Sequence, residues 1–310
     1  MNRTMLLPVF GALLLTVGCE DFEWGDINRY HEDFQYSYDV KPGVHLYVEN
    51  LNGSVEITGW EKNSVQITGT KHASEEATLK ALKIDIVNSA DSVRIRTIGP
   101  SGHRGGYGAK YVIRLPQHAV IEQVDSSNGG IRIESIDGTA RARTSNGSIK
   151  AYRVAGPVEL RTSNSSVEVA DIPGGAVIGT SNGGIRAEGV KGILDATTTN
   201  AGINVTLSDP DAQKPIKLQS SNGGVELTMN SFKDNDIRIA TSNSSITLRL
   251  PAAAHGMLRA HTSNSSVNCD FDITVKAGQL TKNWVEGQIG TGGPVVDLST
   301  SNGAIRVQRI

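Results

Sequence analysis

The chain is poor in cysteine, in aromatic residues and in net charge. Its 310 residues include 2 Cys and 5% aromatics, and 30 Lys and Arg against 32 Asp and Glu leave a net charge of -2. Few bulky side chains are therefore available to fill a wide core, which favours a fold of thin cross-section. The balanced charge creates no field of one sign, so we expect no nucleic-acid partner.

The sequence also lacks an apolar run that could span a membrane as a helix. Its N-terminal run, Met5–Val17, has 13 residues, whereas a transmembrane helix needs about 20. Such a run is typical of a signal peptide. Residues 14–19 (Leu-Leu-Thr-Val-Gly-Cys) resemble a bacterial lipobox, in which the cysteine is lipidated. We therefore predict a lipoprotein signal peptide over residues 1–18 and lipidation at Cys19.

The predicted signal peptide and lipidated cysteine imply an exported protein that is anchored by lipid to a bacterial membrane. Glu20 follows the cysteine where an Asp retains some lipoproteins at the inner membrane, which favours the outer membrane. An ordinary signal peptide that leaves Cys19 as a free thiol is the alternative. Residues 19–39 are interpreted as a tether with a lead-in strand. If Cys19 carries lipid, Cys269 has no disulfide partner, and we interpret it as a small core residue.

Internal repeats are the most informative feature of the sequence. The phrase Thr-Ser-Asn, or a close variant, recurs with two small residues after it, and a looser copy ends at Asn52. Successive copies are first 18 residues apart and later 21 or 22, while the last interval, of 38, holds two repeats or one repeat with a long loop. The Asn of the copies stands at positions Asn128, Asn146, Asn164, Asn182, Asn200, Asn222, Asn243, Asn264 and Asn302.

Each repeat shows the alternation of a strand. Three and five residues after each Asn the residue is apolar, as at Ile149 and Ala151, and the residue between them is polar in every copy. The 18-residue repeats add a second apolar pair after a glycine, as at Val158 and Leu160. Each repeat thus contains two short strands and two turns, and it can bury its apolar strip only against stacked copies, about 4.8 Å apart.

The fold prediction is therefore an all-β parallel β-solenoid, a single-stranded, right-handed β-helix with about 18–22 residues per rung. Its regular part spans residues 124–310. Residues 40–123 are predicted to form irregular first rungs of the same body, with a separate small β domain as the alternative. Within them, 74–82 is a short helical insertion with Ser74 as its N-cap.

Strand alternation, continued through the corner, turns the Thr and the Asn of the motif inward and the Ser outward. Buried amides must be paired, so we expect the nine Asn side chains to bond to one another along the solenoid axis and the Thr hydroxyls to form a second ladder. On this interpretation the motif is structural, and Asn164→Asp should cost several kcal/mol. Inward Thr rows also argue against ice binding.

Basic residues outside the motif are the candidates for ligand contact. Arg132 and Lys150 point outward from one strand column, whereas Arg141, Arg143 and Arg161 point outward from another, so the two groups lie on different faces. They could contact an anionic glycan or lipopolysaccharide, although solvated surface charge is the favoured interpretation.

The sequence does not indicate a catalytic activity. Parallel β-helices include polysaccharide lyases and hydrolases, so a carbohydrate-active β-helix enzyme is kept as the alternative. The outward column Lys150, Glu168 and Arg186 alternates in sign, as in the charge ladders that stabilise neighbouring strands, which favours a structural role for it. The histidines show no metal-ligand spacing, and no glycine-rich phosphate loop is present. We predict no catalytic residues, no metal and no cofactor.

Three segments carry a family resemblance: residues 48–60 (Val-Glu-Asn-Leu-Asn-Gly-Ser-Val-Glu-Ile-Thr-Gly-Trp), 111–116 (Tyr-Val-Ile-Arg-Leu-Pro) and 290–307, which ends in Thr-Ser-Asn-Gly-Ala-Ile-Arg-Val. Together with the repeats, they resemble the bacterial "putative adhesin" β-strand-repeat family of unknown function. The resemblance implies a β-solenoid on a lipoprotein, a role at the cell surface or in the periplasm, and partners among envelope glycans or proteins. It implies no catalytic residue and no oligomeric state.

Overall fold

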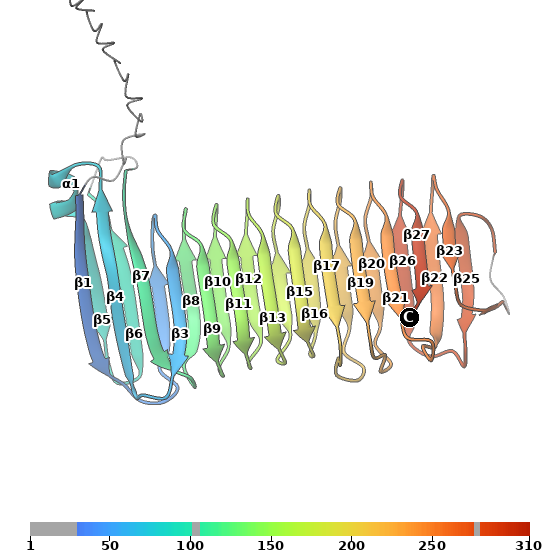
Figure 1. Ribbon diagram of the computed structural model, residues 1–310, viewed down its shortest axis with the longest axis horizontal. Helices are drawn as coiled ribbons and strands as arrows, with labels where there is room; N and C mark the ends of the chain where they lie inside the picture. The colour runs from blue at the N-terminus through green and yellow to red at the C-terminus, as the bar shows by residue number, and fades with distance from the viewer. Residues whose placement is uncertain (1–29, 101–105, 276–279) are drawn as a thin grey trace, which may run out of the picture.

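A computed structural model describes residues 30–100, 106–275 and 280–310. The predicted signal peptide, Cys19 and the first part of the tether lie outside the described residues. The described chain forms an elongated rod of stacked strands (Figure 1). Two sheets run along the rod, one of 13 strands and one of 14, and each regular rung contributes one strand to each sheet. The predicted β-solenoid is confirmed.

The first sheet contains, in spatial order, β1 (Tyr30–Asp39), β4 (Ser64–Ala73), β7 (Tyr107–Pro116), β3 (Val55–Trp60), β9 (Ile131–Ile136), β11 (Ile149–Val154), β13 (Val167–Ile172), β15 (Ile185–Val190), β17 (Ile203–Leu207), β19 (Val225–Met229), β21 (Ile246–Leu250), β27 (Ile305–Arg309) and β23 (Val267–Cys269). The second contains β24 (Ile273–Thr274), β25 (Trp284–Ile289), β22 (Gly256–Thr262), β26 (Val295–Thr300), β20 (Ile237–Ala240), β18 (Ile216–Gln219), β16 (Leu194–Thr197), β14 (Ala176–Gly179), β12 (Val158–Thr162), β10 (Ala140–Thr144), β8 (Val120–Ser126), β2 (His45–Glu49), β6 (Ser92–Ile98) and β5 (Lys83–Asn88).

Equivalent residues of neighbouring repeats are hydrogen-bonded neighbours in the sheets. Ile149 lies in register between Ile131 and Val167, and all three are buried. In the second sheet Val158 lies in register between Ala140 and Ala176. Side chains alternate along each strand, so one residue faces a continuous apolar core between the two sheets and the next residue faces solvent.

Residues 40–123 contribute to the same two sheets and the same core. Val48 and Val55 are fully buried and belong to the core that also holds the regular rungs. The helix α1 spans Glu76–Ala81, and its N-cap is Glu75, without a side-chain capping bond. The prediction that Ser74 is the N-cap is wrong, because Glu75 holds that position. Ser74 lies one residue further from the helix, and its backbone N–H bonds to the carbonyl of Gly106.

The lead-in strand of the predicted tether belongs to the folded body. β1 (Tyr30–Asp39) pairs along its whole length, antiparallel, with β4. The lead-in strand expected within residues 19–39 is therefore β1. Antiparallel pairs also complete the rod elsewhere: β5 pairs with β6 at the N-terminal end, and β25 pairs with both β22 and β24 at the C-terminal end.

The order of rungs in space departs from the order in the chain at both ends. The rung formed by β2 and β3 lies between the rung of β6 and β7 and the rung of β8 and β9. The last rung, β26 and β27, lies between the rung of β20 and β21 and the rung of β22 and β23. The 38-residue interval thus contains the β24–β25 segment and a return of the chain into the rod.

Candidate functional site

The Thr-Ser-Asn corners combine a buried threonine with an exposed asparagine. Thr144 is 2% exposed, whereas Ser145 and Asn146 are both exposed, and the same division holds at the other regular corners. The inward orientation predicted for the Asn is therefore wrong. Thr144 is the last residue of β10, and Ser145 to Gly147 form the turn, so the alternation of side chains ends with the strand.

The buried threonine hydroxyls bond to the backbone and not to one another. Thr144 Oγ1 donates to the carbonyl oxygen of Gly129 on the preceding rung at 3.0 Å and accepts the N–H of Gly147 at 3.3 Å. Thr162 Oγ1 donates in the same way to the carbonyl of Gly147 at 2.8 Å. The predicted second ladder of hydroxyls is wrong, because each hydroxyl satisfies a corner carbonyl instead.

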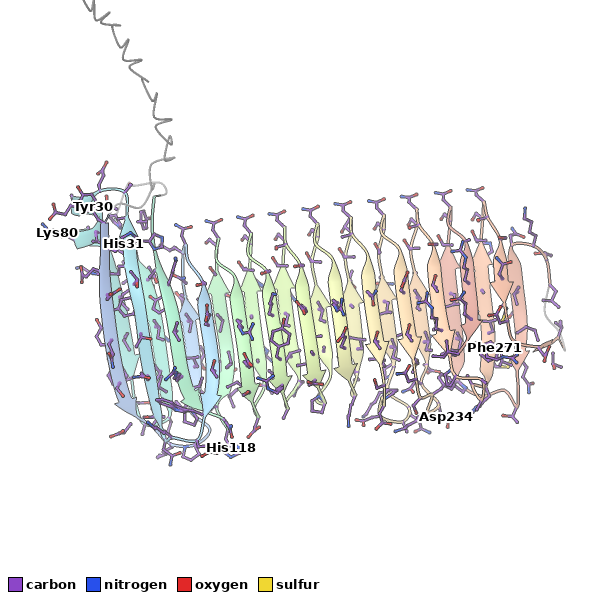
Figure 2. All side chains as sticks on the ribbon, in the orientation of Figure 1. Tyr30, His31, Lys80, His118, Asp234 and Phe271 are labelled. Carbon is purple, nitrogen blue, oxygen red and sulfur yellow. The ribbon has the colours of Figure 1, made fainter. Side chains whose placement is uncertain are left out.

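The asparagine amides form a continuous ladder on the exposed edge of the rod (Figure 2). Nδ2 of Asn146 donates to Oδ1 of Asn128 at 2.5 Å, and Asn164 donates to Asn146 at 2.6 Å. The ladder follows the spatial order of the rungs, so Asn302 lies between Asn243 and Asn264. Its members are Asn52, Asn128, Asn146, Asn164, Asn182, Asn200, Asn222, Asn243, Asn302 and Asn264.

The two predicted contact residues of the first sheet, Arg132 and Lys150, are paired with acidic neighbours. Arg132 on β9 holds Glu134 through Nε at 3.0 Å and Nη2 at 2.8 Å, and Arg153 also contacts Glu134. The hydrogen bonds from Arg132, which have the largest effect, and from Arg153 lower the pKa of the Glu134 carboxyl below its ordinary value. Lys150 on β11 pairs with Glu168 at 3.4 Å. Little donor capacity is left here for an anionic ligand.

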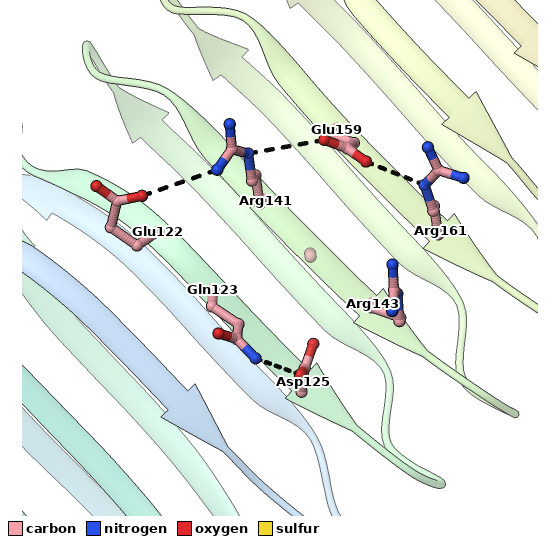
Figure 3. Close-up of a pocket in the computed structure, with 8 residues that line it drawn as sticks. Glu122, Gln123, Asp125, Arg141, Arg143, Glu159 and Arg161 are labelled. Atoms are coloured by element: carbon pink, nitrogen blue, oxygen red, sulfur yellow. Dashed lines mark hydrogen bonds and ion pairs between the residues drawn. The ribbon is translucent and has the colours of Figure 1, made fainter.

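The basic residues of the second sheet are less completely paired (Figure 3). Arg141 on β10 lies 4.0 Å from Glu122 and 3.7 Å from Glu159, and Arg161 on β12 donates Nε to Glu159 at 3.0 Å. Arg143 on β10 forms no ion pair or side-chain hydrogen bond with any residue that the structure describes. The predicted basic residues therefore lie on two faces, and among them only Arg143 has no partner within the described residues.

Two shallow depressions adjoin these arginines. The first, of about 240 Å³, is lined by three acidic residues as well as by Arg141, Arg143 and Arg161. The second, of about 340 Å³, shares Arg143 and Arg161 but has no acidic residue in its lining. We call this second hollow the arginine depression; its other outward residues are Ser145, Ser163, Gly179 and Ser181.

Other titratable groups do not converge on a site. Cys269, at the end of β23, is half-buried against the core, and burial raises the pKa of its thiol. His72 on β4 is buried with an unpaired Nδ1, and its pKa is lowered by burial and then by Lys110 and His31. Within the described ranges, no three His, Cys, Asp or Glu side chains are grouped as metal ligands.

The described part of the chain contains no helix with the length and apolar character required to cross a bilayer.

Comparison with known proteins identifies a family. The family described as Toastrack DUF4097 matches residues 44–308. Compared with curated proteins, the chain has no match.

Solved structures similar to the chain include a "putative cell adhesion protein" from Clostridium sporogenes, with 14% identity over 90% of this chain and 100% of that one, and a TM-score of 0.23. A "putative adhesin" from Parabacteroides distasonis is 10% identical over 90% of this chain and 97% of that one, with a TM-score of 0.25. A "putative adhesin" from Bacteroides fragilis is 12% identical over the same shares, with a TM-score of 0.27.

Proposed function

The chain belongs to the Toastrack DUF4097 family, and from this premise we propose that it is a non-catalytic binding or scaffold protein of the bacterial cell envelope. In this proposal the β-solenoid is an adhesin-like body that presents flat, polar surfaces to envelope glycans or proteins. It requires no cofactor, and its partners do not include nucleic acid, because the net charge is only -2.

The pairing of surface carboxyl groups with basic side chains is the observation that carries the non-catalytic part of the proposal: Glu134 lies 2.8 Å from Arg132, and Glu286 lies 2.9 Å from Arg259. The hydrogen bond from Arg132 lowers the pKa of Glu134, and that from Arg259 lowers the pKa of Glu286. Among the described carboxyl groups with a shifted pKa, every shift is downward. A general acid that cleaves a glycan needs the opposite, a carboxyl kept protonated near neutral pH.

The first experiment separates binding from cleavage. The full-length protein, kept soluble in detergent, is applied to a glycan array and is incubated separately with the polysaccharides that it retains. We expect retention of one or more envelope-type glycans and no new chain ends over hours of incubation. A rise in reducing or unsaturated chain ends would contradict the proposal and would support the carbohydrate-active alternative.

We propose from the sequence motif at Cys19 that the protein is anchored by lipid to a bacterial membrane, with the outer membrane favoured. The chain enters the rod at one end, through β1, which begins at Tyr30 (Figure 1). A lipid at Cys19 would therefore attach the rod at that end. Metabolic labelling with a fatty-acid analogue should modify the wild-type protein and not Cys19→Ala, and the variant should lose its membrane attachment. Equal labelling of both proteins would contradict the proposal.

A further inference from the structure

We propose that the arginine depression binds the carboxylate groups of a uronic-acid polysaccharide, through Arg143 and Arg161. This inference rests on the proposed function, because it assigns a surface and a ligand class to a binding protein. The two arginines lie directly opposite each other in register on the parallel strands β10 and β12. Both are exposed, and both line the same hollow of about 340 Å³.

Two like charges in this arrangement repel each other unless an anion lies between them. Directly opposed like charges on neighbouring strands are destabilising. At Arg132 and Lys150, which are also in register, each cation has its own acidic partner, Glu134 and Glu168 respectively. In the arginine depression, Arg161 has such a partner in Glu159, whose carboxylate lies 3.0 Å from its Nε, whereas Arg143 has none among the residues that the structure describes.

The neighbours of the two arginines along the column leave their donors available. On one side Asp125 is in register with Arg143, but Gln123 donates to its carboxylate at 2.5 Å. On the other side Gly179 is in register with Arg161 and provides no side chain at all. Arg161 uses Nε for Glu159, so its two terminal amino groups and the whole Arg143 guanidinium can bind a carboxylate.

Gly179 also creates the space for a ligand. A Cβ at this position would come no closer than 3.8 Å to any atom outside its chain neighbours, the nearest being Cγ of Arg161. The backbone therefore tolerates a larger residue, and the open floor of the depression depends on the absence of a side chain. The position provides a substitution that fills the site without disturbing the fold.

The surroundings favour a polysaccharide over an acidic peptide. Peptides commonly add as a strand to a free sheet edge, but β10, β12 and β14 each have a neighbouring strand on both sides. The depression instead borders a row of exposed hydroxyls, Ser145, Ser163 and Ser181, that repeats once per rung. A row with this period suits a ligand that itself repeats its hydroxyl and carboxylate groups.

The test uses the full-length protein and three soluble probes: polygalacturonate, its fully methyl-esterified form, and poly-glutamate. Calorimetry at low ionic strength should show binding of polygalacturonate, at least tenfold weaker binding of the neutral ester, and weakening of the polygalacturonate complex by added salt. Poly-glutamate should bind at least tenfold more weakly than polygalacturonate. Equal or tighter binding of poly-glutamate would overturn the ligand class in favour of an acidic polypeptide.

Variants locate the site. Arg143→Gln with Arg161→Gln should weaken polygalacturonate binding at least tenfold. The matched control, Arg186→Gln with Arg238→Gln, removes the same charge from exposed positions outside the depression and should change binding less than twofold. Gly179→Asp places a carboxylate in register with Arg161 and should also abolish binding while the melting temperature stays at or above the wild-type value.

These outcomes separate this inference from the proposed function. If polygalacturonate binds but the Arg143 and Arg161 variants bind it as well as the wild type, the depression is not the site, although the protein remains a glycan-binding protein. If polygalacturonate does not bind while the glycan array retains other glycans, the ligand class is wrong and the proposed function stands. If the array and all three probes show no binding, both proposals fail.

Discussion

At the scale of single residues, the corner motif has two structural roles, one for a buried threonine hydroxyl and one for an exposed asparagine amide. Thr162 is 6% exposed and satisfies a carbonyl of the neighbouring rung, whereas Asn164 bonds to its neighbours at the surface. Leaving a buried polar group unpaired costs about 1–3 kcal/mol, whereas a typical hydrogen bond contributes about 1 kcal/mol net. The threonine should therefore contribute more to stability than the asparagine, whereas strand alternation alone predicts that both are buried.

We expect Thr162→Val to lower the free energy of unfolding by about 1–3 kcal/mol, because it leaves the Gly147 carbonyl without its donor. Asn164→Asp should cost about 1 kcal/mol, because the carboxylate still accepts from Asn182 but cannot donate to Asn146. Urea denaturation of both variants measures the two values. A larger loss for Asn164→Asp would contradict the assignment of these roles.

His72 gives the protein a dependence of stability on pH. Burial lowers its pKa in the folded state below the ordinary 6.5, so below that pH the unfolded chain binds more protons than the folded one. The contribution of His72 to stability is thus present above about pH 6.5 and is lost as the pH falls.

We expect the midpoint of urea denaturation to fall between pH 7 and pH 5, and His72→Gln to reduce that fall. His118→Gln serves as the control, because His118 is exposed and lies far along the chain from β4. An unchanged pH profile in His72→Gln would show that other groups cause the dependence.

At the scale of secondary-structure elements, the rungs out of chain order secure both ends of the solenoid. β26 lies between β20 and β22, and β27 lies between β21 and β23. The C-terminal strands are therefore internal, and they must be in place before β22 and β23 can join the rod. In an ordinary solenoid the last rung is free to fray from the end.

Destabilising the last rung should consequently loosen strands that precede it in the chain. Leu298, fully buried on β26, is the position to test, and replacement by Ala typically costs about 2–5 kcal/mol at buried leucines. Hydrogen exchange should quicken in β22 and β25 as well as in β26. For comparison, Leu160→Ala on β12 should quicken exchange in β10 and β14 and leave β22 unchanged. Full protection of β22 in Leu298→Ala would contradict this account.

At the scale of the whole molecule, the described residues of the rod are held by packing and hydrogen bonds, with no disulfide among them. The whole sequence has two cysteines, and Cys269 is free. Its two sheets enclose one continuous apolar core, and antiparallel strands complete both ends.

We expect the melting temperature to be the same with and without a reducing agent, within about 1 °C. Differential scanning calorimetry of the full-length protein at several concentrations provides the measurement, and Cys269→Ala controls for the thiol itself. A fall in melting temperature on reduction that the Cys269→Ala variant does not show would reveal a disulfide that contributes to stability.

The parallel stacking, the register and most of the core could be predicted from the amino-acid sequence alone. A residue such as Ile149 recurs every rung, and only in-register stacking buries all copies of the column together. The separation of the basic residues onto two faces followed from the same counting, because Arg132 and Arg143 belong to different strands of the rung.

The direction of the asparagine side chains, the order of the terminal rungs and the location of the unpaired charge depend on the folded chain and could not be predicted from the repeats. Alternation is a property of extended backbone, and it does not continue through the turn at Ser145. Because the residues of one strand would pair equally well with the equivalent residues of any other rung, the repeat pattern does not predict that Asn302 precedes Asn264 in space. Whether Arg143 has a partner depends on side chains from three strands, and their distances exist only in the folded chain.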